Sequence, residues 1–140
     1  MKAWLRRLFG AAPEADEWRI STGDEAGQPV VVRTRTRPPR GMTADGYPAS
    51  VEVLWRFDGV GRGGLPPPEL AMLMDACEGL LQTLEGPANG MLGIAITGNN
   101  RREWIWYVAD ADAFAGRVRA LLVTSGARFP VEVRRSTAAP

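Results

Sequence analysis

Glu103 and Tyr107 are the residues best suited to acid–base or ligand chemistry, and they lie in the segment Arg-Arg-Glu-Trp-Ile-Trp-Tyr-Val beside Arg102. A partly buried carboxylate can exchange a proton near neutral pH, and arginine and tyrosine side chains orient polar or anionic ligands. Asp110 and Asp112 add two carboxylates near the same end of the predicted sheet. These residues support one hypothesis, a small enzyme or ligand-binding protein with its site at Glu103 and Tyr107.

Each carboxylate also has a structural explanation, which we favour. Glu103 is expected either at the rim of the sheet in water or in an ion pair with Arg101 or Arg128, because a partly buried carboxylate usually has a partner. Asp110 and Asp112 precede an apolar helical pattern, where an aspartate caps the first turn and interacts favourably with the positive end of the helix. We therefore assign no catalytic residue and lean against an enzyme.

The composition removes several classes of chemistry. The chain has no histidine, so it lacks the commonest general base and the Ser-His and Cys-His nucleophile pairs. Cys77 is the single cysteine and lies on an apolar helical stripe, which predicts a buried, unreactive thiol, no disulfide and no metal site. No disulfide is needed, and Arg6 and Arg7 interrupt the apolar run in Met1–Ala12, which leaves it too short for a signal peptide. We therefore expect a cytoplasmic protein.

Residues 59–64 match G-x-G-x-x-G between a predicted strand and a predicted helix, the position of a dinucleotide-binding turn. The next residues include Pro66, Pro67 and Pro68, and proline lacks the backbone N–H that would bind a pyrophosphate. An antiparallel hairpin also follows the helix, where a dinucleotide-binding fold needs a parallel strand. We therefore expect a connecting loop here and no cofactor.

Arg33, Arg35 and Arg37 alternate with threonine along a predicted strand, and Arg40 follows. Such a row could follow the phosphate backbone of a nucleic acid. The chain, however, has 17 basic and 16 acidic residues and a net charge of +1, so its overall field attracts neither nucleic acid nor an anionic membrane. We favour a charged edge strand that blocks aggregation, and nucleic-acid binding through this row remains a weaker alternative.

The segment Met91–Val108 predicts a β-hairpin with a two-residue turn at Asn99-Asn100, because asparagine tolerates the positive φ angles of such a turn. The register of this hairpin places tryptophans over small residues on one side, pairing Ala95 with Trp104 and Gly93 with Trp106. The other side is aliphatic, pairing Ile94 with Ile105 and Leu92 with Tyr107.

The remaining elements complete one α+β domain over residues 18–135, after a flexible segment at 1–17 and before a disordered tail at 136–140. Further strands are predicted at Trp18–Thr22, Pro29–Thr36, Ala49–Phe57 and Phe129–Arg135. One helix runs from the proline triplet to Gly86, and another from Asp110 or Asp112 to Gly126. From Ala49 on, the order is β-α-β-β-α-β, which predicts a ferredoxin-like antiparallel sheet with two helices on one face. The extra N-terminal hairpin either extends this sheet or crosses its open face.

The sheet face opposite the helices is the predicted binding surface. The residues placed there, with Glu52, Leu54 and Glu132, are Arg56, Arg102, Trp104, Trp106 and Arg134. Aromatic and arginine side chains together are typical of binding hot spots. The competing interpretation, slightly favoured, is that Trp18 and the N-terminal hairpin cover this face and make it a second core layer.

The order of several short motifs resembles the bacterial family known as domain of unknown function 695, over roughly residues 18–133. The motifs are a strand beginning at Trp18, Tyr47-Pro48, Leu65-Pro66 before a helix with Glu69 and Glu78, Thr97-Gly98, Arg102-Glu103 and Tyr107. Some members of that family resemble fusions with a regulator-of-ribonuclease-E type domain. The resemblance therefore implies a regulatory or protein-binding role.

Taken together, these observations favour a non-catalytic, cytoplasmic bacterial module that binds a protein partner, or a second copy of itself, through the open face of its sheet. The abundance of Ala, Gly, Pro and Arg is typical of a GC-rich bacterial genome. No membrane partner is expected.

Overall fold

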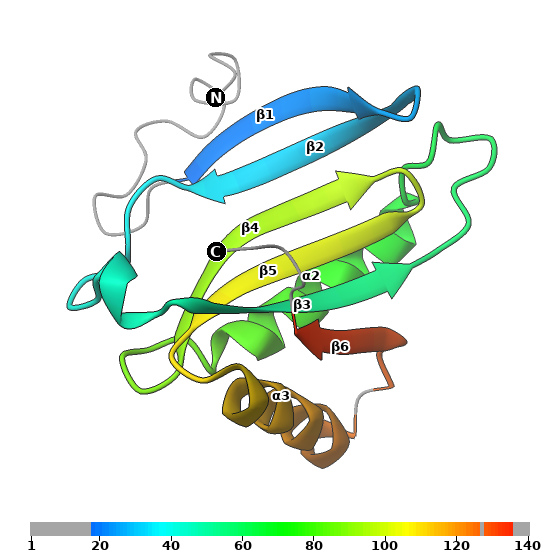
Figure 1. Cartoon of the computed structure of the whole chain (residues 1–140). Helices are drawn as coiled ribbons and strands as arrows, with labels where there is room; N and C mark the ends of the chain where they lie inside the picture. Colours follow the sequence, from blue (N-terminus) through cyan, green and yellow to red (C-terminus); the bar gives the residue numbers. More distant parts are fainter. Residues whose placement is uncertain (1–17, 127, 136–140) are drawn as a thin grey trace.

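The computed structural model describes residues 18–126 and 128–135, which form a six-stranded sheet with two helices (Figure 1). All neighbouring strands are antiparallel. This is an α+β fold, as the order of elements predicts. The predictions of a flexible segment at 1–17 and a disordered tail at 136–140 lie outside the described residues.

The strands lie in the order β1-β2-β4-β5-β3-β6. The N-terminal hairpin consists of β1 (Trp18–Glu25) and β2 (Gln28–Arg35). Because β2 pairs with β4 (Gly90–Gly98), this hairpin extends the sheet and does not cross its face. The sheet continues through β5 (Arg101–Val108) and β3 (Ala49–Arg56) to β6 (Val131–Arg135) at the far edge. A short 3₁₀ turn, η1 (Ala44–Gly46), lies between β2 and β3.

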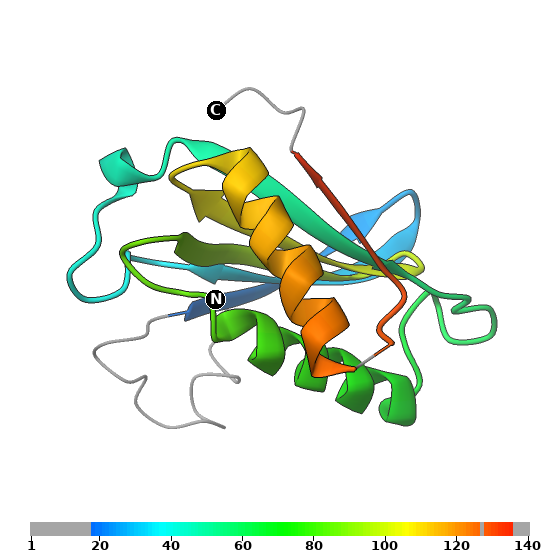
Figure 2. The same cartoon turned by 90° about the horizontal axis from the view of Figure 1, so that it is seen from below.

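Both helices pack on the same side of the sheet (Figure 2). The first, α2 (Pro68–Gln82), begins with proline, whose missing N–H is harmless in a first turn. The second, α3 (Ala111–Ser125), is capped by the Asp110 carboxylate, which accepts a hydrogen bond from the Ala113 N–H at 3.0 Å. It ends at Gly126 with a φ of 71°. No helix among the described residues is long and apolar enough to cross a membrane.

The tryptophans of β5 lie beneath the helices, so the prediction that they occupy the opposite face is wrong. Trp104 and Trp106 are both 0% exposed. The indole N–H of Trp104 donates to Glu78 of α2 at 2.8 Å, and the ring of Trp106 packs against Phe114 of α3 with centroids 5.0 Å apart. Both sides of the β4–β5 hairpin are apolar, and the helices cover the one with the larger aromatic area to bury.

The β4–β5 hairpin has the predicted turn but contains one irregularity. Asn99 and Asn100 have φ angles of 50° and 66°, and Ala95 lies opposite Trp104 as predicted. The register then shifts between Leu92 and Ile94, so Leu92 lies opposite Trp106 and Met91 opposite Tyr107. The predicted partners for these two positions, Gly93 and Leu92, are therefore wrong by one residue, because a β-bulge inserts an extra residue that period-2 pairing does not anticipate.

Two charged side chains satisfy the backbone that this bulge takes out of the sheet ladder. The Glu85 carboxylate accepts from the Leu92 N–H at 2.9 Å, and the Arg35 Nε donates to the Leu92 carbonyl oxygen at 2.9 Å. Glu85 and Arg35 also pair with each other at 2.8 Å. The β-bulge is thus held by Glu85, which follows α2, and by Arg35 of β2.

The two buried tryptophans provide a matched test of this packing. The Nε1 of Trp104 has a hydrogen-bond partner, whereas the Nε1 of Trp106 is buried without one among the described residues. We expect Trp104→Phe to lower the free energy of unfolding by about 1–2 kcal/mol more than Trp106→Phe, because it leaves a carboxylate less satisfied. Urea denaturation measures both; equal losses would contradict the role assigned to the Trp104–Glu78 bond.

Candidate functional site

The sheet face that the helices leave open has an apolar half and a charged half. On β2, β4 and β5 the side chains that share this face are mostly apolar; these are Val32, Ile94, Ile96, Ile105 and Tyr107. On β3, β5 and β6 they are mostly charged; these are Glu52, Arg56, Arg101, Glu103, Glu132 and Arg134. The register joins the halves directly, because Ile105 pairs with Glu52 and Ile96 pairs with Glu103.

An apolar pocket of about 330 Å³ opens at the end of the apolar half. Its walls come from the end of β2, the connection that carries η1, and the β4–β5 hairpin. Tyr107 is 38% exposed at this pocket, while the Tyr47 hydroxyl is held by a 2.8 Å hydrogen bond to the Pro87 carbonyl oxygen. Gly93 lies under the Tyr107 ring, since a Cβ there would be 2.2 Å from it. The pocket has the size and character to accept one apolar side chain.

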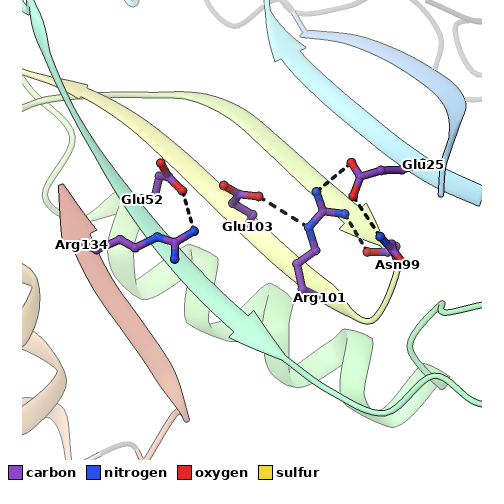
Figure 3. A network of polar contacts seen from close by, with 7 residues as sticks. Glu25, Glu52, Asn99, Arg101, Glu103 and Arg134 are labelled. Atoms are coloured by element: carbon purple, nitrogen blue, oxygen red, sulfur yellow. Dashed lines mark hydrogen bonds and ion pairs between the residues drawn. The ribbon is translucent and has the colours of Figure 1, made fainter. Parts of the chain in front are cut away.

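The charged half carries a row of ion pairs that crosses the sheet (Figure 3). Arg134 of β6 donates to Glu52 at 3.2 Å, and Arg101 lies 3.5 Å from Glu103. Arg101 also contacts Glu25 at 3.1 Å, and Asn99 donates to the same carboxylate at 3.0 Å. The expected ion pair between Glu103 and Arg101 is thus present. Alternating charges of this kind offer a partner both donors and acceptors across one surface.

Two carboxylates of this row, Glu103 and Glu25, have shifted pKa values. Burial raises the pKa of the Glu103 carboxyl above the usual 4.5, and a hydrogen bond and repulsion from the Glu52 carboxylate raise it further, while Arg101 and Arg134 act in the opposite direction. The pKa of Glu25 is instead lowered, mainly by the hydrogen bond from Asn99. The two carboxylates that flank Arg101 therefore respond differently to pH.

Glu103 and Tyr107 share the open face but line different hollows. Glu103 borders a polar hollow of about 470 Å³ together with Arg56, Arg101 and Arg134, whereas Tyr107 borders the apolar pocket. Four residues along a strand separate the two side chains by roughly 13 Å. They are therefore not arranged to act together on one small substrate.

The structure divides the predicted binding residues between the two faces. Arg56 and Arg134 lie on the open face, paired with Glu132 and Glu52 respectively. Arg102 is 8% exposed on the helix side, where it donates to Thr97 and to Asp75 of α2, both at 2.8 Å. Like Trp104 and Trp106, it supports the core and is not available to a partner.

The arginine row of β2 also points toward the helices. β2 lies between β1 and β4, so the prediction of a charged edge strand is wrong. Arg33 pairs with Glu78, the side chain of Arg35 is 4% exposed, and both guanidinium groups lie over the ring of Trp18, at 5.3 and 4.5 Å from its centroid. These arginines fasten the N-terminal hairpin to α2, so the geometry assumed for tracking a phosphate backbone is missing.

The other candidate sites have structural explanations. Cys77 is buried, which raises the pKa of its thiol to about 12. The glycine loop packs on the hairpin turn: Asn100 Oδ1 accepts from the Gly59 N–H, and the Asn100 N–H donates to the Gly64 carbonyl oxygen, both at 3.0 Å. A Cβ on Gly59 would lie 2.6 Å from Gly64. Within residues 18–126 and 128–135, no cluster of three or more acidic, cysteine or histidine side chains is placed to hold a metal ion.

No protein-family model matches this chain, and no curated protein is similar enough to count as a relative.

Sequence reasoning named Arg101 only as a possible partner of Glu103 and did not include it in the open face, and it missed the pocket beside Tyr107. The Arg-Arg-Glu segment already contains Arg101, and period-2 alternation places it on the same face as Glu103. The pocket could not be found in this way, because its walls come from three separate parts of the chain.

Glu103→Gln tests the electrostatics of the charged half. The folded pKa of Glu103 lies above its unfolded value, so the native state binds this proton more tightly and ionised Glu103 costs stability at neutral pH. That cost disappears as the pH falls through the folded pKa toward 4.5. We expect E103Q to be at least as stable as wild type at neutral pH, with an advantage that shrinks in acid, measured by urea denaturation over a pH series.

The exposed Glu132, whose side chain is 57% accessible, provides the control. Glu132→Gln should change stability little at any pH in the series. An E103Q advantage that does not vary with pH would contradict the assignment.

Gly93→Ala tests the close contact beneath Tyr107. The added methyl group must displace the aromatic ring, so we expect a loss of about 1–3 kcal/mol in unfolding free energy. Gly79 of α2 is the control, because a Cβ there has no neighbour within 4 Å and Gly79→Ala should stabilise the helix by up to about 1 kcal/mol. Thermal denaturation of both variants measures these changes. A G93A variant as stable as wild type would mean that Tyr107 is not held over the glycine.

Proposed function

We propose that this protein is a non-catalytic binding module that holds a protein partner against the open face of its sheet. This proposal rests on the open face of the sheet, which no described helix covers (Figure 2). On that face the apolar half, with its pocket, lies directly beside the charged half. Protein interfaces combine an apolar anchor in a pocket with a polar rim in the same way.

The proposed partner inserts one apolar side chain into the pocket beside Tyr107. The charged groups of the partner then contact the charged half of the face, at Arg101, Glu103, Glu52 and Arg134. These contacts would determine the position and orientation of the partner more than the strength of binding. We give less weight to a small enzyme, since Glu103 and Tyr107 line different hollows.

We further infer that the part of the domain from β3 onward is a ferredoxin-like unit to which the β1–β2 hairpin is added. The support is the strand order β4-β5-β3-β6 with antiparallel neighbours, together with two helices on one side. We also propose that the chain is a member of the domain of unknown function 695 family and acts in the bacterial cytoplasm. Three residues of the motifs behind that resemblance, Arg102, Glu78 and Trp18, connect the strands and α2 around the core.

Site-specific photo-crosslinking in the source organism tests the binding proposal. A photoreactive phenylalanine analogue at Tyr107 should capture a discrete partner, and the same analogue at Val123, 82% exposed on α3, should not. Combining Ile105→Arg with the analogue at position 107 should reduce capture by about tenfold or more, since a charge in the apolar half removes a hot-spot contact.

Val123→Arg is the matched control and should leave capture at position 107 unchanged. Thermal denaturation of both arginine variants establishes that they are folded. Equal capture from positions 107 and 123, or capture that survives Ile105→Arg, would refute binding through the open face.

A further inference from the structure

The outer edge of β1 is a long strand edge to which no other described strand pairs. β1 has eight residues, contains no proline and pairs with β2 without a register shift. Natural sheets usually shorten, bend or cover such an edge, because its unpaired backbone groups attract other strands. The opposite edge is treated in this way: β6 has five residues, and Arg119 of α3 donates to the Val133 carbonyl oxygen at 3.0 Å.

The turn between β1 and β2 determines which backbone groups point outward. Ala26 and Gly27 form a two-residue turn with φ angles of 51° and 78°, closed by the pair Glu25 and Gln28. Because a hydrogen-bonded pair closes such a turn, every second residue back from Glu25 bonds to β2. The N–H and C=O groups of Ile20, Thr22 and Asp24 therefore face the outer edge.

We propose that β1 pairs antiparallel with β1 of a second copy of this chain, about a twofold axis through Thr22. In one continuous sheet, opposed residues point to the same face and their outward backbone groups meet. Residues of equal parity must therefore face each other, and centring on Thr22 places Ile20 opposite the second copy's Asp24. This register pairs the outward backbone groups of Ile20, Thr22 and Asp24 of both chains.

The charged side chains of β1 favour this register and favour a second copy of β1 as the pairing strand. With Thr22 on the axis, Arg19 lies opposite the second copy's Glu25, and the twofold repeats that pair at the other end. Both side chains point to the open face, and the Glu25 carboxylate is still 46% exposed despite its contact with Arg101. An antiparallel copy therefore places the positive start of β1 opposite the negative end of the other β1, and cross-strand pairs of opposite charge stabilise a sheet.

This proposal does not depend on the proposed function, but it affects the same face. The apolar half of the open face lies on the β1 side of the sheet, over β2, β4 and β5. Pairing through β1 would bring the two apolar halves to either side of the junction. The dimer would then present one extended surface with two pockets.

Disulfide trapping tests the register. Cys77 is 0% exposed, so a cysteine introduced on β1 would be the reactive thiol of the described residues. Thr22→Cys places two thiols opposite each other across the axis, with the Cα spacing of an antiparallel pair, which a disulfide spans. We expect rapid formation of a linked dimer under mild oxidation. Asp24→Cys, at an equally exposed edge position, is the control, because its two copies would be roughly 13 Å apart along the strands.

Analytical ultracentrifugation of the full chain tests the association itself. Wild type should show a reversible, concentration-dependent dimer, and Thr22→Pro should abolish it while leaving the fold intact, since the Thr22 N–H is not used by β2. Arg19→Glu should weaken the dimer, whereas Arg117→Glu, the same charge change on the exposed side of α3, should not. A wild-type monomer at every concentration, equal trapping at positions 22 and 24, or pairing of β1 with a different protein would overturn the proposal.

Discussion

The burial of Trp104 and Trp106 beneath α2 and α3 is the constraint on which the rest of the structure depends. These side chains occupy the centre of the core, and their strand can bury only one of its faces under the helices. Once they lie on the helix side, alternation along β5 places Glu103, Ile105 and Tyr107 on the other. The mixed apolar and charged composition of the open face therefore follows from the burial of Trp104 and Trp106 in the core.

A second layer of interactions makes the N-terminal hairpin part of the same body. Glu78 accepts hydrogen bonds from both Trp104 and Arg33, and Arg35 reaches across β4 to Glu85 and the bulge at Leu92. Desolvation offsets much of the attraction in partly buried charge pairs of this kind, so they add little to net stability. Here they connect β2 to α2 and to the segment that follows α2, while the backbone pairing of β2 with β4 extends the sheet.

The open face and the outer edge of β1 are two surfaces with different physical characters. The face offers apolar area and side-chain charges, which favour recognition of a particular protein. The edge offers backbone hydrogen bonds, which any extended chain can satisfy, so its selectivity must come from cross-strand pairs such as Arg19 with Glu25. On the open face, Glu103 is paired with Arg101 and borders a different hollow from Tyr107.

Local patterns in the sequence determined the Asn99-Asn100 turn, the proline start of α2 and the Gly126 stop of α3. They narrowed the cap of α3 to Asp110 or Asp112, and they offered Arg101 as one of the possible partners of Glu103. Each depends on neighbours along the chain or directly across a tight turn. Only the tertiary structure decided which face of the hairpin the helices cover, because both faces are apolar. It also decided that β2 is internal and that Gly93 bulges, because these features depend on contacts between distant segments. Arg102, Trp104 and Trp106 lie in the core and not on the open face for this reason: alternation assigns side chains to two faces, but packing alone decides which face is the core.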